Sequence, residues 1–175
     1  MRRLILGLVV VAALAATVLS GAAGAAARAD ELAAVRAATA KFHDVDAATA
    51  AGYGVFYVCT DETGKGAMGQ HYVNGGLVGD AILDPAAPEA IMYEPLPGGG
   101  QRLVGVEWVV FKAAWEEAGH TDAPWLFGKP LTLVRDPNRY GIPSFYQLHA
   151  WIWKPNPAGT YKDWNPRVSC RGNGD

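Results

Sequence analysis

Three side chains with metal-binding atoms stand in segments that are otherwise apolar or rich in glycine. Glu107 lies in a run of valines with a tryptophan, and His149 lies in a run of aromatic residues. His71 lies in a glycine-flanked segment, where backbone freedom suits a site loop. Two imidazoles and one carboxylate are a donor set that suits Zn²⁺ or Fe²⁺ with open coordination positions. The residue types therefore predict a metal centre formed by His71, Glu107 and His149.

The metal and the alternatives stay open at this level. Met68, three residues before His71, would add a sulfur ligand and would favour copper. Without a metal, His149 would be a core histidine bonded to a backbone carbonyl, and His71 an exposed loop histidine. A buried carboxylate needs a partner, which for Glu107 could also be one of three arginines: Arg102, Arg135 or Arg139.

The run Phe145–Trp153 is the longest strand signal in the chain, with aromatic and branched residues between prolines. Side chains alternate across a strand, so one face is apolar and typical of a core: Tyr146, Leu148, Ala150 and Ile152. The other face carries Phe145, Gln147, His149, Trp151 and Trp153. Large rings around a few polar groups are typical of a small-molecule pocket. We therefore predict an aromatic-lined pocket that holds a metal ion or a small ligand, with Trp151, Trp153, Gln147 and Tyr72 as its ligand-binding residues.

The elements that must position these residues are one helix and several strands. Spacings of three and four predict a helix over 30–51, and a second, short helix is expected over 112–118. Strands are predicted over 53–59, 90–94, 102–111, 130–134 and 145–153. In the strand 102–111, alternation places Val104, Val106, Trp108 and Val110 on one face and Leu103, Glu107, Val109 and Phe111 on the other. This order predicts an α+β fold with a mostly antiparallel sheet that could curl into a partial barrel.

The N-terminal residues predict a secretory signal peptide over 1–29. Arg2 and Arg3 precede an apolar run, and Ala27-Arg28-Ala29 is a small-x-small cleavage pattern. An uncleaved membrane anchor is the alternative, because about 20 apolar residues span a bilayer. We expect one exported domain over 30–175, with no stable membrane association after cleavage.

The two cysteines, Cys59 and Cys170, are expected to form one disulfide in an exported chain. A bond across so long a loop contributes roughly 4–5 kcal/mol in the chain-entropy model. It would hold the irregular, proline-containing tail that follows Lys154. Metal-binding or catalytic thiolates are the alternative use.

The charge of the chain and the motifs that it lacks exclude some classes of function. Of the 15 basic residues, Arg2, Arg3 and Arg28 leave with the leader, so 12 basic residues face 17 acidic ones and the net charge is −5. Nucleic-acid binding is excluded, because no stretch concentrates lysine or arginine. Ser144 and Ser169 are the serines after the leader, and neither lies in a nucleophile elbow.

Several motifs resemble an uncharacterised family of small exported bacterial proteins. They are Met68-Gly69-x-His71-Tyr72-Val73-Asn74, Pro88-Glu89, Tyr93-Glu94-Pro95, Leu103-Val104-Gly105-Val106-Glu107-Trp108 and Asp163-Trp164-Asn165-Pro166-x-Val168-Ser169-Cys170. The resemblance implies one compact exported domain closed by a disulfide, and no activity.

Three functions follow as hypotheses. The first is an exported binding protein that holds Zn, Fe or Cu, or a small molecule, around His71, Glu107 and His149. The second is a metal-dependent enzyme that acts on a small substrate with Glu107 as ligand or general base. The third is a secreted interaction module without a pocket, in which Glu107 pairs with an arginine and aromatic residues form an exposed patch.

Overall fold

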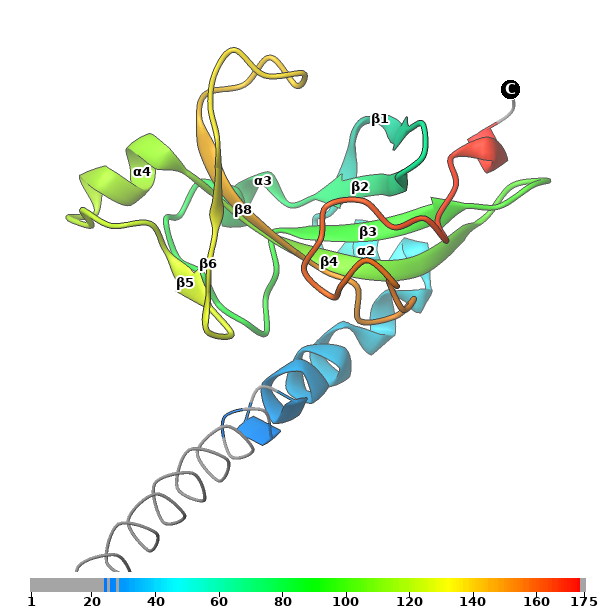
Figure 1. The fold of residues 1–175 in the computed structure, drawn as a ribbon, viewed down its shortest axis with the longest axis horizontal. Helices are drawn as coiled ribbons and strands as arrows, with labels where there is room; N and C mark the ends of the chain where they lie inside the picture. Colours follow the sequence, from blue (N-terminus) through cyan, green and yellow to red (C-terminus); the bar gives the residue numbers. More distant parts are fainter. Residues whose placement is uncertain (1–23, 25, 28, 174–175) are drawn as a thin grey trace, which may run out of the picture.

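The computed structural model describes residues 24, 26–27 and 29–173. An N-terminal helix leads into a six-stranded antiparallel sheet with the order β1-β2-β3-β4-β8-β7 (Figure 1). The sheet is curled into a half-barrel, and the C-terminal segment folds back over it. The predicted α+β fold with a mostly antiparallel sheet is confirmed.

The main sheet consists of β1 (Gly54–Glu62), β2 (Gly66–Val73), β3 (Ala90–Pro95), β4 (Gln101–Phe111), β7 (Thr132–Val134) and β8 (Phe145–Ala150). A separate pair contains β5 (Trp125–Leu126) and β6 (Lys129–Pro130). The short helices are η1 (Ala40–His43), α2 (Val45–Ala50), α3 (Gly75–Val78), α4 (Lys112–Glu117) and η2 (Arg171–Asn173).

The helix predicted over 30–51 is interrupted at Asp44. Residues 29–39 are helical, η1 follows, and Asp44 adopts an extended conformation before α2. The Tyr93 hydroxyl donates to the carbonyl of Phe42, and the amide of Asp46 donates to the Asp44 side chain. These two bonds replace the helical bond that the carbonyl of Phe42 and the amide of Asp46 would otherwise share. The predicted single helix is therefore wrong at this point.

The segment 68–74 was predicted as a site loop, but residues 68–73 lie in the inner strand β2 and Asn74 precedes α3. His71 pairs with Phe56 on β1 and with Met92 on β3. Gly69 has a φ of +85°, and a Cβ at this position would lie 2.6 Å from the carbonyl oxygen of Tyr93. The glycine therefore permits close strand contact, although in the sequence it resembles a loop signal.

The two faces of the sheet bury different clusters. One face packs against the N-terminal helix through residues such as Trp108, Tyr93 and Leu148. A bulge where β3 meets β4 shifts the alternation, so Leu103 joins this face and Val104 packs on the other with Met92 and Trp151. The predicted placement of Leu103 and Val104 was thus reversed.

The predicted disulfide is confirmed. Cys59 on β1 is bonded to Cys170, 111 positions further along the chain. The tail before it is also fixed by two backbone hydrogen bonds between Ala67 and Asn165, which is completely buried. The tail therefore has a defined position beside β2.

Within the described part of the chain, no helix is long and apolar enough to cross a membrane. The predicted leader, residues 1–29, lies almost entirely outside the described residues, so its cleavage stays a prediction.

Glu89 gives a prediction about stability and pH. The side chain is 1% exposed and accepts a hydrogen bond from the amide of Val109. Burial raises the pKa of Glu89 from 4.5 to about 8. Between these values the folded protein keeps a proton that the unfolded chain releases, so this group lowers the free energy of unfolding as pH rises from about 4.5 to about 8.

Thermal denaturation between pH 4 and 9 measures this effect. The melting temperature of the wild type should fall as the pH rises through this range. The fall should be smaller in the Glu89→Gln variant, because glutamine does not titrate. Glu117→Gln is the matched control, since Glu117 is exposed. Parallel pH profiles for the wild type and Glu89→Gln would contradict the assignment.

Candidate metal centre

Three strands bring His71, Glu107 and His149 together. Glu107 on β4 and His149 on β8 are direct cross-strand neighbours. His71 on β2 is separated from β4 by β3, where the residue paired with Glu107 is the small, buried Ala90. This small side chain leaves room for the imidazole of His71 to approach the carboxylate.

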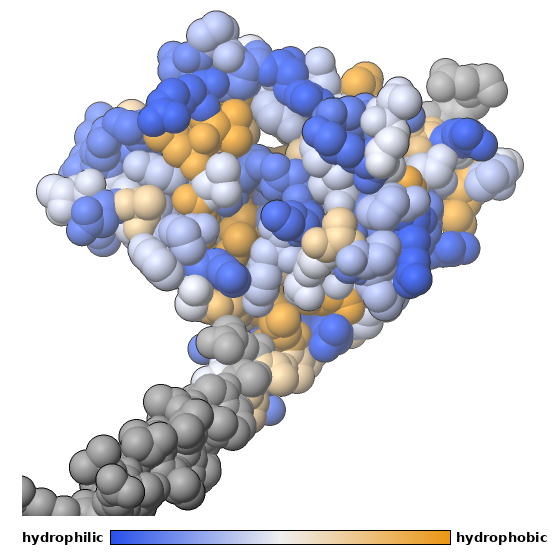
Figure 2. All heavy atoms as spheres, viewed as in Figure 1, coloured by the Kyte–Doolittle hydropathy of each residue, from blue (hydrophilic) through white to orange (hydrophobic). Residues whose placement is uncertain are grey.

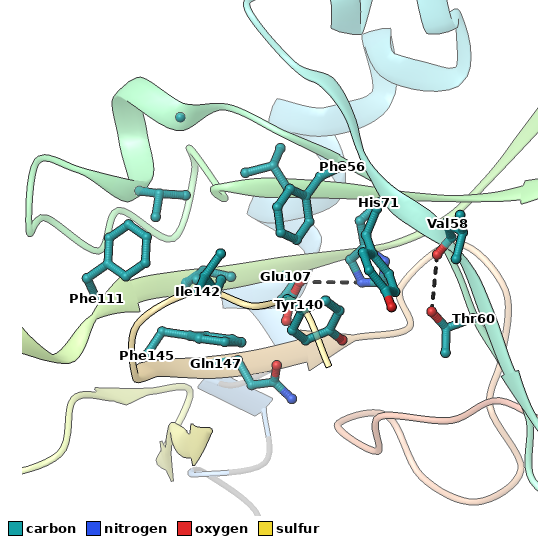
Figure 3. Close-up of a pocket in the computed structure, with 15 residues that line it drawn as sticks. Phe56, Val58, Thr60, His71, Glu107, Phe111, Tyr140, Ile142, Phe145 and Gln147 are labelled. Carbon is teal, nitrogen blue, oxygen red and sulfur yellow. Dashed lines mark hydrogen bonds and ion pairs between the residues drawn. The ribbon is translucent and has the colours of Figure 1, made fainter. Parts of the chain in front are cut away.

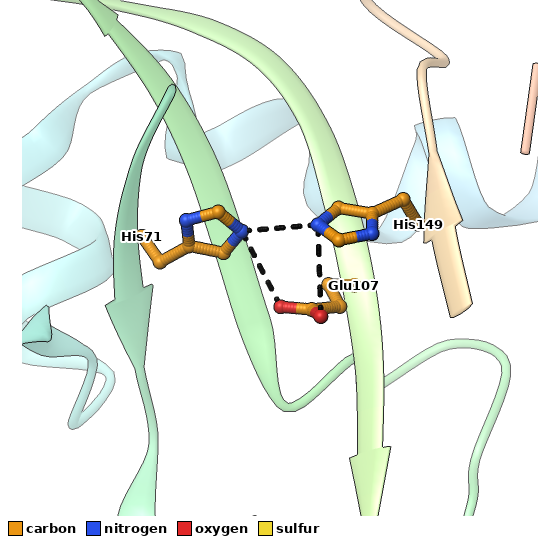
Figure 4. Close-up of side chains that lie close together, drawn as sticks. All are labelled: His71, Glu107 and His149. Carbon is orange, nitrogen blue, oxygen red and sulfur yellow. Dashed lines mark hydrogen bonds and ion pairs between the residues drawn. The ribbon is translucent and has the colours of Figure 1, made fainter. Parts of the chain in front are cut away.

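The three side chains point toward one another (Figure 4). The two Nε2 atoms are 3.2 Å apart. Nε2 of His71 lies 3.4 Å from Oε2 of Glu107, and Nε2 of His149 lies 3.6 Å from Oε1 of the same carboxylate. One ligand atom from each residue lies within 4.8 Å of the other two, so the group could hold a metal ion. His149 and Glu107 are buried, and His71 is largely covered.

The separation of the two nitrogens matches one edge of a coordination tetrahedron. Zinc–nitrogen bonds of about 2.0–2.1 Å place two ligands of a tetrahedral ion about 3.3–3.4 Å apart. The two Nε2 atoms are 3.2 Å apart, and each lies within 3.6 Å of a different oxygen of Glu107. Three protein ligands would leave a further position for water or substrate.

The partners on the outer side of each ring decide where the ring protons lie. Nδ1 of His149 faces Asp163 Oδ1 at 3.3 Å, and His71 is hydrogen-bonded to the backbone of Gly69. A carboxylate or carbonyl partner holds a proton on the nitrogen that it faces. The Nε2 atoms therefore face each other and Glu107, an arrangement that either a proton shared between the two rings or a bound cation stabilises.

Burial and neighbouring charges shift the pKa values of all three groups. Burial, with His149 nearby, lowers the pKa of His71 to about 3, so this imidazole is neutral. Burial raises the pKa of Glu107, and His149 partly offsets this effect. Burial opposes protonation of His149, but the carboxylates of Glu107 and Asp163 outweigh it and raise its pKa. A single positive charge is therefore favoured inside the cluster.

Asp163 and Gln147 extend the cluster outward. The close contact with Nδ1 of His149 lowers the pKa of Asp163, and a weaker contribution comes from the Gln147 side chain, which donates to the same carboxylate. A carboxylate behind a metal-bound histidine fixes the ring and strengthens it as a ligand. Asp163 is thus in position to orient His149.

Replacing Asp163 with asparagine should weaken metal binding by about 10- to 100-fold while the stoichiometry is unchanged. The expected cause is the loss of the negative charge behind His149. Competition with a chromophoric chelator measures the affinity, and Asp61→Asn at an exposed position is the control. Equal affinities for wild type and Asp163→Asn would show that Asp163 has no orienting role.

A cavity of about 220 Å³ adjoins His71 and Glu107 (Figure 3). Its polar lining residues are Thr60, His71, Glu107 and Gln147. Its aromatic lining residues are Phe56, Tyr57, Phe111, Tyr140 and Phe145. The aliphatic ones include Val58, Val73, Val78, Val109 and Ile142. Figure 2 shows hydrophobic atoms and a hollow below the polar loop that joins β7 to β8.

Two predicted pocket residues lie elsewhere because β8 ends at Ala150. Beyond it the backbone turns, and Trp153 lies against His43 and donates to the hydroxyl of Thr39 on the helix side. Trp151 stays beside His149 with parallel rings, but it packs with Met92 and Val104 and donates to the carbonyl of Lys162. Trp151 thereby holds the segment that carries Asp163, and the prediction that both tryptophans are pocket walls is corrected.

The structure places Tyr72 away from the three ligands and gives Met68 a different partner. Tyr72 packs on Tyr93, on the opposite face of β2 from His71. Met68 is buried, and its sulfur accepts from the hydroxyl of Tyr140 at 3.9 Å. Gln147 does line the cavity, as predicted.

The hypothesis of an interaction module predicted an arginine as the partner of Glu107, but the partners in the structure are histidines. Glu107 faces His71 and His149, whereas Arg102 lies 3.6 Å from Glu94. Glu94 also contacts Lys154. The arrangement around Glu107 is therefore the one expected for a site.

Sequence reasoning missed Asp163 and most of the cavity walls. Asp163 lies in a tail without periodicity, and its contact with His149 depends on the fold of that tail. Tyr140 and Ile142 lie in a loop, and Phe56 lies next to a bulge in β1. The one sequence feature that included Asp163 was the motif Asp163-Trp164-Asn165-Pro166, which it begins.

Comparisons of the chain with protein-family models, with curated proteins and with solved structures give no match. The resemblance to an exported bacterial family therefore stays a prediction.

Proposed function

We propose that this chain is an exported protein that binds one divalent transition metal through His71, Glu107 and His149. Zinc is the ion that the donor set and the separations favour. A tetrahedral ion needs ligand atoms about 3.3 Å apart, whereas an octahedral ion with the same bonds needs them about 2.9 Å apart. The distance of 3.2 Å between the two Nε2 atoms is nearer to the tetrahedral value.

The observation that carries the proposal is that both Nε2 atoms face each other and the carboxylate of Glu107 at 3.2 to 3.6 Å. Each histidine has a partner behind it, Gly69 for His71 and Asp163 for His149. Such outer partners are typical of metal-bound histidines.

Export is supported by the disulfide and by the predicted leader. A disulfide between Cys59 and Cys170 is stable in an oxidising compartment and is rare in the cytosol. The disulfide would be intact in such a compartment, so the metal affinity should be measured with the oxidised protein.

Equilibrium dialysis of chelator-treated protein against Zn²⁺, Fe²⁺ and Cu²⁺ tests the proposal. We expect one zinc per chain, and less than a tenth of that in the His71→Ala/His149→Ala variant. Copper bound more tightly than zinc in a Met68-dependent manner would change the metal assignment. Retention of one zinc by the double variant would refute the proposed ligands.

A second candidate function is metal-dependent catalysis. The observation that favours it is the position of the cavity, which reaches Glu107 and His71 and so the open side of the ion. Catalytic zinc sites have three protein ligands and one exchangeable position. Cobalt-substituted protein should change its visible spectrum on addition of azide, and an unchanged spectrum would argue for a closed binding site.

A further inference from the structure

The cavity beside the metal ligands has one polar end and one apolar end. In Figure 3 Glu107 and His71 lie on one side, and Phe111 and Phe145 lie on the other. The cavity volume of about 220 Å³ exceeds the roughly 150 Å³ of an apolar protein cavity that binds benzene. The space therefore accommodates an aromatic ring with a few additional atoms.

Tyr140 is at the centre of the aromatic part of this cavity. Its ring centroid lies 5.3 Å from that of Tyr57, 5.8 Å from that of Phe56 and 6.0 Å from that of Phe145. Edge and tilted arrangements at these distances are favourable for aromatic rings. A flat apolar ligand would add a further ring to an existing aromatic cluster.

The charge at the polar end determines the head group. An ion of charge +2 bound by one carboxylate and two neutral imidazoles has a net charge of +1 at its direct ligands. Asp163 offsets this charge from behind His149 and is not a cavity-lining residue, so the positive charge of the ion faces the cavity and favours a ligand with an anionic head group. Oxygen anions are also suitable ligands for the fourth position of zinc.

We propose that the cavity binds a small aromatic or similarly apolar molecule through a single anionic oxygen group, such as a carboxylate, that occupies the open position of the metal. The apolar part lies between Tyr140, Phe145 and Val109. This inference rests on the proposed metal site, and it adds the chemical class of the ligand.

Calorimetry of the zinc-loaded protein with three probes tests this inference. The probes are 3-phenylpropanoate, which has both features, acetate, which has the head alone, and 3-phenylpropylammonium, which has a cationic head. We expect 3-phenylpropanoate to bind about 30-fold or more tightly than acetate, because the ring and its linker leave water. We expect at least tenfold weaker binding to zinc-free protein and to the cationic probe.

A variant pair locates the binding site. Ile142→Trp places a larger side chain in the cavity and should remove the preference for 3-phenylpropanoate over acetate. Ile82→Trp is the control, because Ile82 is 63% exposed and is not a cavity-lining residue. Zinc content and circular dichroism are recorded for each variant.

The outcomes separate the two proposals. Failure of the wild type to bind zinc overturns the metal site and this inference with it. Zinc binding with equal affinities for 3-phenylpropanoate and acetate overturns the ligand class and leaves the metal site intact. Equal binding of the anionic and cationic probes, or an unchanged preference in Ile142→Trp, also overturns this inference.

Discussion

Replacing His149 with alanine is expected to lower the zinc affinity by at least about 100-fold. Loss of a group that merely orients a ligand costs 10- to 100-fold, and His149 is placed to be a ligand itself. Its removal would also leave Glu107 buried with one partner fewer, since Nε2 of His149 lies 3.6 Å from Oε1. A chelator-competition titration of the oxidised protein measures the affinity.

The matched control for this variant is His120→Ala. His120 is exposed and stacks on Trp115, away from the three ligands. Its replacement should leave the zinc affinity within about twofold. Equal affinities for His149→Ala and His120→Ala would mean that any bound zinc is held at another site.

The second large effect is expected from the Cys59→Ser/Cys170→Ser variant. The disulfide closes a loop with a sequence separation of 111, for which the chain-entropy model gives roughly 4–5 kcal/mol. We expect the free energy of unfolding to fall by about this amount, a large fraction of the stability of an ordinary domain. Urea denaturation of zinc-free protein measures it, because bound metal would add its own stabilisation.

The disulfide variant also tests how the tail supports the metal site. The tail carries Asp163, and its attachments besides the disulfide include the backbone bonds between Ala67 and Asn165, the bond from Trp151 to the carbonyl of Lys162 and the bond from the amide of Ser169 to Glu94. If these attachments are sufficient, the zinc affinity should decrease by less than tenfold. Unchanged stability on loss of the disulfide would contradict the entropic estimate.

Two of the strands that carry the site could be predicted from the sequence, because their hydrophobic alternation is strong. Residues 102–111 and 145–153 are long apolar runs, and β4 and β8 occupy most of them. Glu107 and His149 were recognisable as candidates because a polar group in such a run needs a partner. Their direct cross-strand pairing depends on register, which spacing along the chain does not give.

The parts that could not be predicted depend on local irregularities. The glycines of β2 resemble loop residues, although Gly69 allows close contact with Tyr93. The bulge opposite Met92 reverses Leu103 and Val104, and the turn after Ala150 moves Trp153 to the helix side. The bulge and the turn each change the side of the sheet on which the following residues lie. The predicted assignment of residues to the two faces was therefore correct only in the regular parts of the strands.

Anomalous X-ray diffraction at the zinc absorption edge from crystals of the zinc-loaded protein is the most direct test of the proposed metal ligands. We expect one strong anomalous peak about 2 Å from Nε2 of His71, Nε2 of His149 and a carboxylate oxygen of Glu107. A peak at other side chains, or no peak among these three in zinc-containing crystals, would contradict that assignment.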